Sequence, residues 1–173
     1  MKKLHLLTLT LIALLAAPVA SFAQFATEGV WTSVCSVGVI DEADVGLYQF
    51  DQSNLSFASG AIGSIIARYN VVNTSNAFGS QQPAWNTFEL GYTDIGAGAI
   101  SAFLYEVEPC TGARTTICAF TTVNNPAPAC QTCQFPNNTF DFENHLYFVA
   151  LVLSRGTTAT NPLASTLRIY ANP

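Results

Sequence analysis

The longest apolar run beyond the N-terminal region spans residues 146–153 and constrains the fold more than any other stretch. Every position in it is apolar, so polarity shows neither the period of two of a strand nor the period of 3.6 of a helix. Aromatic and β-branched residues such as Tyr147 and Val149 favour an extended strand. Asn138 and Gly156 bound the segment with turn-forming residues. We therefore predict a central strand that is buried on both faces.

The segments before this run have the patterns of shorter strands. Apolar and polar residues alternate in 62–72 and in 85–92, as they do in half-buried strands. Turn-forming residues also separate two pairs of segments, which predicts two antiparallel hairpins. The paired segments are 46–50 with 55–57 and 100–108 with 116–123.

These patterns together indicate an all-β chain. Residues 24–173 contain no stretch with apolar residues at the i, i+3, i+4 and i+7 positions of a capped helix. About seven to nine short strands separated by turns predict a single antiparallel β-sandwich. Jelly-roll and immunoglobulin-like topologies are both open, and closure into a barrel is the alternative.

The N-terminal region has the layout of a secretory signal peptide. Lys2 and Lys3 precede an apolar stretch at 6–17, and the small residues Ser21 and Ala23 follow it. We expect cleavage after Ala23, so that 1–23 is removed and 24–173 forms one domain. The chain is then secreted to the extracellular space, the periplasm or the cell surface. No later apolar run approaches the roughly twenty residues of a membrane-spanning helix, so we expect no membrane-embedded part.

Charge argues against two classes of partner. Residues 24–173 contain no lysine, and four arginines stand against eleven carboxylates, a net charge of −7. Such a surface repels phosphate groups, so nucleic acid and anionic membranes are poor partners.

Five cysteines in an exported chain predict disulfides. We expect the local bridges Cys110–Cys118 and Cys130–Cys133, with Cys35 buried and free. A nested pairing of Cys110 with Cys133 and of Cys118 with Cys130 is the alternative, since spacing does not decide between them.

The Cys-x-x-Cys motif at 130–133 has redox and metal-binding alternatives. A redox-active pair normally lies at a helix N-terminus, whereas proline-rich loop and strand flank this one. A zinc site that adds Cys110 and Cys118 would have a first spacing wider than that of a zinc knuckle. A structural bridge is therefore the preferred interpretation.

Two long polar loops, at 73–83 and 124–138, are candidate positions for ligand-binding residues. Trp85 follows the first loop, close to Gln81 and Gln82. Aromatic rings can stack on sugar rings while amides bind hydroxyl groups, so we predict a glycan site at Trp85, Gln81, Gln82 and Tyr92. Most aromatic residues of a sandwich lie in its core, which is the competing interpretation.

A cluster of acidic residues indicates a possible metal site. Asp41, Glu42 and Asp44 place three carboxylates within four residues, and calcium is held by such oxygen ligands. The spacing matches no fixed calcium loop, so the alternative is an acidic turn in solvent. Calcium is the single cofactor that we predict as possible.

Two further pairs of acids allow a catalytic alternative. Glu106 with Glu108, and Asp141 with Glu143, each lie two residues apart on a predicted strand. Glycoside hydrolysis uses two carboxylates at a suitable separation. His145 is the only histidine in 24–173, and no Gly-x-Ser-x-Gly motif occurs.

The sequence thus favours a secreted or cell-surface, non-catalytic binding or structural module with a glycan or protein ligand. A small glycosidase-like hydrolase with a paired-carboxylate site is the alternative. The two would differ in whether acids converge in a pocket or aromatic rings lie exposed.

Overall fold

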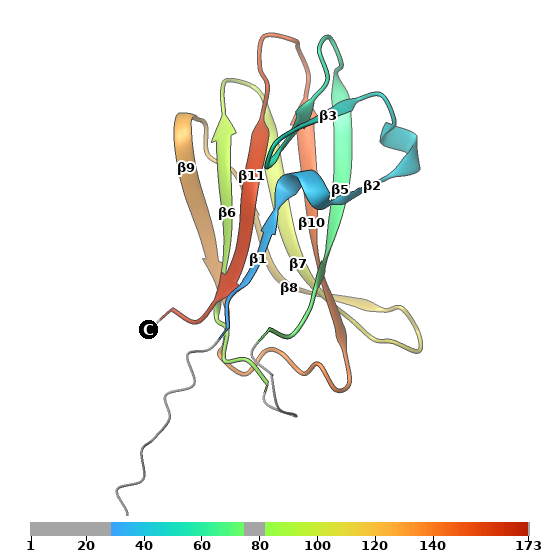
Figure 1. Cartoon of the computed structure of the whole chain (residues 1–173), viewed down its shortest axis with the longest axis vertical. Coiled ribbons are helices and arrows are strands. Elements are labelled where there is room, and N and C mark those ends of the chain that lie inside the picture. Colours follow the sequence, from blue (N-terminus) through green and yellow to red (C-terminus); the bar gives the residue numbers. More distant parts are fainter. Residues whose placement is uncertain (1–28, 75–81, 173) are drawn as a thin grey trace, which may run out of the picture.

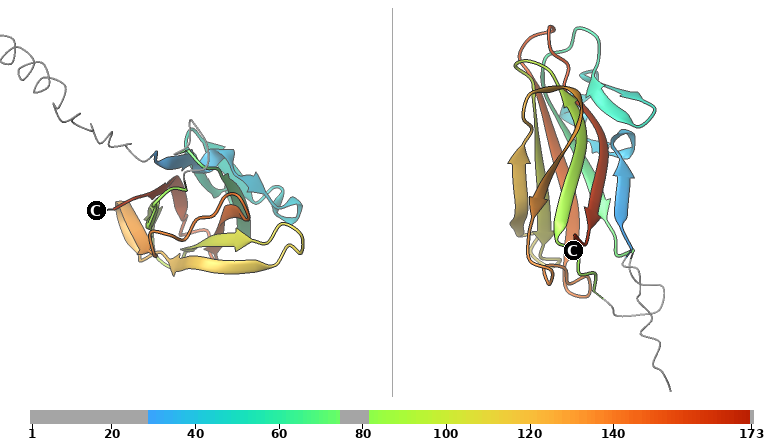
Figure 2. Two further views of the ribbon diagram at one scale, coloured as in Figure 1. Left: turned by 90° about the horizontal axis from the view of Figure 1, so that it is seen from below. Right: turned by 90° about the vertical axis from the view of Figure 1, so that its left-hand side faces the viewer.

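Two antiparallel sheets face each other as the layers of a β-sandwich (Figures 1 and 2). The computed structural model describes residues 29–74 and 82–172. The predicted signal peptide, 1–23, lies outside these residues. The prediction of an antiparallel β-sandwich is confirmed, and the two separate sheets replace the barrel alternative.

One layer has six strands. β3 and β4 form the first predicted hairpin at one edge, and β9 forms the other edge. β11 lies between β6 on one side and both β4 and β1 on the other. The strands are β1 (Trp31–Val34), β3 (Tyr48–Asp51), β4 (Asn54–Phe57), β6 (Thr87–Asp94), β9 (Asn125–Gln134) and β11 (Leu163–Tyr170).

The other layer has five strands in the order β2-β5-β10-β7-β8. β7 and β8 form the second predicted hairpin, and this hairpin extends beyond the body of the sandwich (Figures 1 and 2). The strands are β2 (Val39–Ile40), β5 (Gly63–Val71), β7 (Ala99–Val107), β8 (Arg114–Thr121) and β10 (Leu146–Arg155). Two short 3-10 turns, η1 (Cys35–Val37) and η2 (Glu42–Asp44), flank β2.

The apolar run predicted to be the central strand is β10, and it does lie in the middle of its sheet between β5 and β7. Its burial on both faces, however, is wrong. Tyr147, Val149 and Leu151 point into the sandwich and are buried, whereas Phe148 on the opposite face is partly exposed and Leu146 is 59% exposed. A two-layer sandwich leaves the outer face of each sheet without a covering layer. One side of the apolar run is therefore open to solvent.

The core fills the space between the sheets. It is built from alternate residues of the facing strands, as the pleat of each strand requires. The largest fully buried side chains are Trp85, Tyr147, Phe57, Phe88, Leu55, Ile65, Leu90, Ile100, Leu104, Leu151, Leu153 and Leu167.

β9 corrects the prediction of a second long loop at 124–138. Pro126 and Pro128 cannot donate backbone hydrogen bonds, which argued against a strand. Within the described residues, β9 pairs only with β6 and so forms an edge. An edge strand tolerates proline because one side of its backbone has no ladder to complete.

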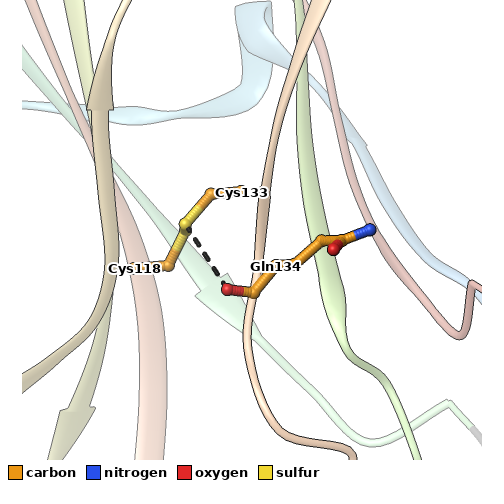
Figure 3. Close-up of a disulfide and its surroundings, with 3 residues drawn as sticks. All are labelled: Cys118, Cys133 and Gln134. Atoms are coloured by element: carbon orange, nitrogen blue, oxygen red, sulfur yellow. Dashed lines mark hydrogen bonds between the residues drawn. A yellow bond between two sulfur atoms is a disulfide. The ribbon is translucent and has the colours of Figure 1, made fainter.

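The disulfide also differs from the prediction. Cys118 on β8 is bonded to Cys133 on β9, with an S–S distance of 2.02 Å (Figure 3). β8 and β9 are the edge strands of opposite sheets, so this bridge joins the two layers. Both local bridges and the nested alternative are wrong.

Strand geometry explains the correction. Residues three apart on a strand point to opposite faces. Cys133 accordingly points into the sandwich while Cys130 is exposed on the outer side of β9. Cys110 lies exposed in the turn between β7 and β8, away from the inward-facing Cys118.

Cys35 is buried and free, as predicted. It lies in η1, where its backbone carbonyl accepts a hydrogen bond from the Tyr69 hydroxyl at 2.7 Å. Burial raises the pKa of the Cys35 thiol to about 12.

We expect two of the three free thiols to react in the native protein. At about pH 8 a thiol reagent should modify Cys110 and Cys130, which are exposed, while the buried, protonated Cys35 should react only after denaturation. Mass spectrometry of the labelled protein counts the modified sites. A Cys35→Ala variant should give the same native count, and rapid native labelling of Cys35 would contradict its burial.

In residues 29–74 and 82–172 no helix is long and apolar enough to cross a membrane.

Candidate ligand-binding groove

The predicted glycan-binding aromatic residues lie inside the protein. Trp85 is 0% exposed, and its indole Nε1 donates a hydrogen bond to the Gly29 carbonyl at 2.5 Å. Tyr92 is also buried, and its hydroxyl donates to the Val123 carbonyl at 3.1 Å. Neither ring has a face open to a sugar. The prediction that Trp85 and Tyr92 stack on a sugar is therefore corrected, because both rings lie in the core of the sandwich.

Gln82 holds two loops together. Its amide oxygen accepts a hydrogen bond from the Phe142 backbone N–H at 2.9 Å, and its amide nitrogen lies 3.4 Å from Asp141 Oδ1. The side chain thus fastens residues 141–142 against the segment before β6. Gln81 lies outside the described residues.

The carboxylates predicted to bind calcium are engaged with the protein. Asp41 Oδ1 accepts a hydrogen bond from the Ala43 N–H at 3.3 Å, and Asp41 Oδ2 lies 3.2 Å from the Arg68 guanidinium. The Ala43 N–H and then Arg68 lower the pKa of Asp41. Asp44 is buried, and its Oδ2 accepts from the Ile66 N–H at 2.7 Å.

Glu42 belongs to the same turn, η2. No group of three or more histidine, cysteine or acidic side chains that could hold a metal occurs in the described part of the chain. The carboxylates of Asp41 and Asp44 instead fix η2 to β5, which lies beside β2.

The two acid pairs come together only in part. His145 Nε2 lies 3.9 Å from Glu106 Oε1 and 3.7 Å from Glu108 Oε2. The Tyr147 hydroxyl donates to Glu106 Oε2 at 3.2 Å and accepts from the Asp141 N–H at 2.7 Å. Burial raises the pKa of Tyr147 to about 12. Glu143 is exposed, and its backbone N–H donates to Asp141.

This arrangement fastens the loop before β10 to the end of β7. Asp141 accepts hydrogen bonds from the Asn144 side chain at 2.7 Å and from the Glu143 N–H at 3.2 Å, and the first of these lowers the pKa of Asp141 most. The Asp141 carboxylate is therefore occupied by hydrogen bonds within its own turn. The paired-carboxylate hydrolase stays a prediction. None of these acids lines the hollow on the outer face of the five-stranded sheet.

A row of aromatic rings lies on the outer face of the five-stranded sheet. Phe103 and Tyr105 alternate outward along β7, and Phe148 on β10 stands opposite Tyr105 in the sheet register. The Phe103 and Tyr105 rings stack with centroids 5.8 Å apart and planes inclined by 9°. The Tyr105 and Phe148 centroids are 5.1 Å apart. All three rings are partly exposed.

Polar side chains flank this row on both sides. Asn70 on β5 stands opposite Phe148, and Arg68 lies two residues before it on the same face. Arg114 on β8 stands opposite Val107, and its guanidinium carbon lies 5.9 Å from the centre of the Phe148 ring. Polar groups on β5 and β8 therefore flank the rings of the two strands between them, β10 and β7.

Phe148 and the polar residues beside it line an open hollow of about 510 Å³, which we call the outer groove. Phe103 and Tyr105 lie next to this hollow on the same face of the sheet. The β7–β8 hairpin forms one wall through Gly112 and Arg114, and Val39, which is 71% exposed, forms the opposite rim. The hollow is within the size range of small-molecule sites. Its lining residues are Val39, Arg68, Tyr69, Asn70, Val107, Gly112, Arg114 and Phe148.

Sequence reasoning missed the outer groove for a local reason. The strand 99–107 has apolar or aromatic residues on both faces near its middle, with Ala102 and Leu104 inward and Phe103 and Tyr105 outward. The pattern of polar and apolar residues therefore did not show which face of this strand points outward. The signal that could have found it is the aromatic pair Phe103 and Tyr105 at a spacing of two.

No family model and no curated protein matches this chain. Among solved structures it is similar to the CBM36-1 domain of a multidomain xylanase from the hindgut metagenome of Trinervitermes trinervoides. That match has a TM-score of 0.51 and 11% identity, and covers 84% of this chain and 99% of that domain. At this identity the likeness shows the β-sandwich fold alone.

Two further matches each have a TM-score of 0.48. One is a carbohydrate-binding module CBM36 in complex with calcium and xylotriose, with 11% identity over 80% of this chain and 98% of that one. The other is the xylan-binding module CBM15, with 12% identity over 84% of this chain and 98% of that one.

Proposed function

We propose that the protein is a non-catalytic glycan-binding module that binds its ligand in the outer groove. The observation that carries the proposal is the exposed aromatic row Phe103, Tyr105 and Phe148 beside Asn70 and Arg114. The C–H faces of sugar rings are apolar and pack on aromatic rings, while their hydroxyl groups bind amides and guanidinium groups.

The fold agrees with this proposal. The CBM36-1 domain that the chain resembles belongs to a xylanase, and a sheet face without a covering layer offers an extended surface to a chain-like ligand. The outer groove is open along the sheet, which suits an oligosaccharide better than a small, fully enclosed molecule.

We also infer that the protein acts outside the cytoplasm. The bridge between Cys118 and Cys133 supports an oxidising compartment. The signal-peptide pattern at 1–23 points the same way.

Replacing the ring of Tyr105 or Phe148 is expected to weaken glycan binding by about tenfold or more, as for buried aromatic anchors of other interfaces. Tyr105→Leu and Phe148→Leu remove the ring but keep an apolar side chain on the strand. Binding is measured on a glycan array and then by calorimetry on the glycans retained.

Phe50→Leu is the matched control, because Phe50 lies on β3 of the other sheet and is 43% exposed. It should bind glycans as the parent protein does. Equal losses in all three variants, or no loss in the Tyr105 and Phe148 variants, would reject the outer groove as the site.

The calcium prediction for Asp41, Glu42 and Asp44 is tested in the same assay, with calcium present or with a chelator. Asp41 pairs with Arg68, which lines the outer groove. A calcium ion at Asp41 would compete with Arg68 for the carboxylate, so metal at this turn would alter the groove itself.

A further inference from the structure

The four arginines of residues 24–173 are not equivalent. Arg68 pairs with Asp41 and Arg168 pairs with Glu89, each at 3.2 Å. Arg155 is buried and donates to the carbonyls of Thr157 and Thr158 at 3.1 and 3.0 Å, and to that of Ala58 at 3.5 Å. Arg114 differs from them. Within the described residues its side chain makes no ion pair or hydrogen bond, and its guanidinium lies over the Phe148 ring.

An unpaired cation is unexpected in this chain, because carboxylates outnumber arginines almost three to one in residues 24–173. Strand alternation explains why the nearest acids do not reach Arg114. Val107, opposite Arg114, faces the outer groove. Glu106, the residue before Val107, points to the opposite face of the sheet, where its carboxylate accepts a hydrogen bond from the Tyr147 hydroxyl. Glu108 lies beside His145.

The lining of the outer groove therefore has the opposite charge to the protein as a whole. Two of its residues are arginines and none is acidic, although the net charge of residues 24–173 is −7. Arg68 is largely neutralised by Asp41 at the rim. The charge that remains without a partner is that of Arg114.

A guanidinium group that lies over an aromatic ring keeps its N–H edges free. Such a group can bind a carboxylate or a sulfate through two parallel hydrogen bonds, which an ammonium group cannot reproduce. The ring also shields one side of the cation from water, which strengthens the interaction with an anion. Arg114 over Phe148 has these features at one wall of the outer groove.

We propose that the outer groove binds an anionic glycan, with Arg114 receiving its acidic group. The inference rests on the proposed glycan-binding function and specifies its ligand class. The acidic group is either the carboxylate of a uronic acid or a sulfate ester, since both present paired oxygens to a guanidinium. A neighbouring sugar ring would pack on Tyr105 and Phe103, which lie beside the outer groove.

Another hollow, around Arg155, serves as an internal comparison. It has a volume of about 540 Å³ and contains Arg155, whose guanidinium carbon lies 5.6 Å from the centre of the Phe57 ring. Because three backbone carbonyls already accept from that guanidinium, it has little capacity left for a ligand. The N–H donors of the Arg114 side chain all remain available to a ligand.

The test compares glycans that share a backbone and differ in charge. Calorimetry measures the binding of oligogalacturonate and its neutral methyl ester, of a sulfated galactan oligosaccharide and its desulfated form, and of xylo-oligosaccharide. We expect one acidic form to bind about tenfold or more tightly than its neutral partner, as expected for a charge-assisted hydrogen bond. The preference should shrink between about 0.05 and 0.5 M salt.

Arg114→Gln should abolish this preference, measured as the ratio of the two affinities, by weakening the binding of the acidic partner far more than that of the neutral one. Arg114→Lys should restore only part of it, because lysine keeps the charge but lacks the planar fork. Arg168→Gln is the matched control. Arg168 also lies over a tyrosine ring, at 4.9 Å from the centre of Tyr170, but it pairs with Glu89 on the other sheet. This variant should behave as the parent protein does.

The possible failures can be told apart. Equal binding of acidic and neutral partners, with binding that still depends on Phe148, would overturn the anionic preference and leave the glycan-binding function standing. An acidic preference that survives in Arg114→Gln would reject Arg114 as the receiving group. The absence of binding to every glycan would overturn the proposed function, and the inference with it.

Discussion

Trp85→Ala is expected to lower the free energy of unfolding by about 3–5 kcal/mol, the range for large aromatic residues removed from a core. The ring is fully buried, and it packs edge-on against Phe140 and Phe142 with centroids 5.2 and 6.1 Å away. The substitution leaves a cavity and removes the hydrogen bond to the Gly29 carbonyl. Urea unfolding followed by circular dichroism measures the loss.

Trp85→Phe separates these two contributions. Phenylalanine retains most of the apolar volume and loses the indole N–H. It should therefore cost less than the alanine variant, about 1–3 kcal/mol for the partly buried Gly29 carbonyl left without this donor and for the smaller ring. Trp85 was also a candidate sugar-binding residue. An alanine variant with parental stability and no glycan binding would restore that interpretation and contradict the burial seen here.

Removing the inter-sheet disulfide is expected to cost about 3 kcal/mol, because Cys118 and Cys133 are 15 residues apart and the bridge limits the unfolded chain. Cys118→Ala combined with Cys133→Ala removes it without leaving a polar group in the interior. The measurement is the midpoint of chemical unfolding, compared with that of the oxidised parent protein.

Cys110→Ala combined with Cys130→Ala is the control, because both thiols are free and exposed. It should change stability by no more than about 0.5 kcal/mol, as surface substitutions usually do. A loss in this control as large as that in the first variant would favour the predicted local bridges, because each of the two variants removes one cysteine from each local bridge.

The sequence predicted what kind of site to expect, but not which residues form it. Aromatic rings beside polar side chains, on an exposed face, were expected of a binding module. The residues chosen for that role, Trp85 and Tyr92, lie in the core instead. The rings that are exposed are those of Phe103, Tyr105 and Phe148, and Phe148 belongs to the run predicted to be buried on both sides.

The cysteines show the same limit. Their number and the export signal predicted disulfides, and Cys35 was expected to be buried and free. The partners depended on two facts that spacing does not contain. The segment 125–134 forms a strand, so Cys130 and Cys133 face opposite ways, and that strand lies at the same edge of the sandwich as β8.

Local sequence determined the strands themselves, because side-chain alternation and β-propensity act within a few residues of each other. The local pattern predicted an antiparallel sandwich, from the segments 62–72, 85–92, 100–108 and 116–123. The apolar run at 146–153 predicted that β10 lies at the centre of one sheet. Only the tertiary structure decided which side of β10 is covered, where Trp85 lies and which cysteines meet. Each of these depends on strands that are distant along the chain, and burial is a property of what the other layer covers. Phe148 and Tyr147 are neighbours in one apolar run, and the second sheet buries Tyr147 in the core while it leaves Phe148 to the outer groove.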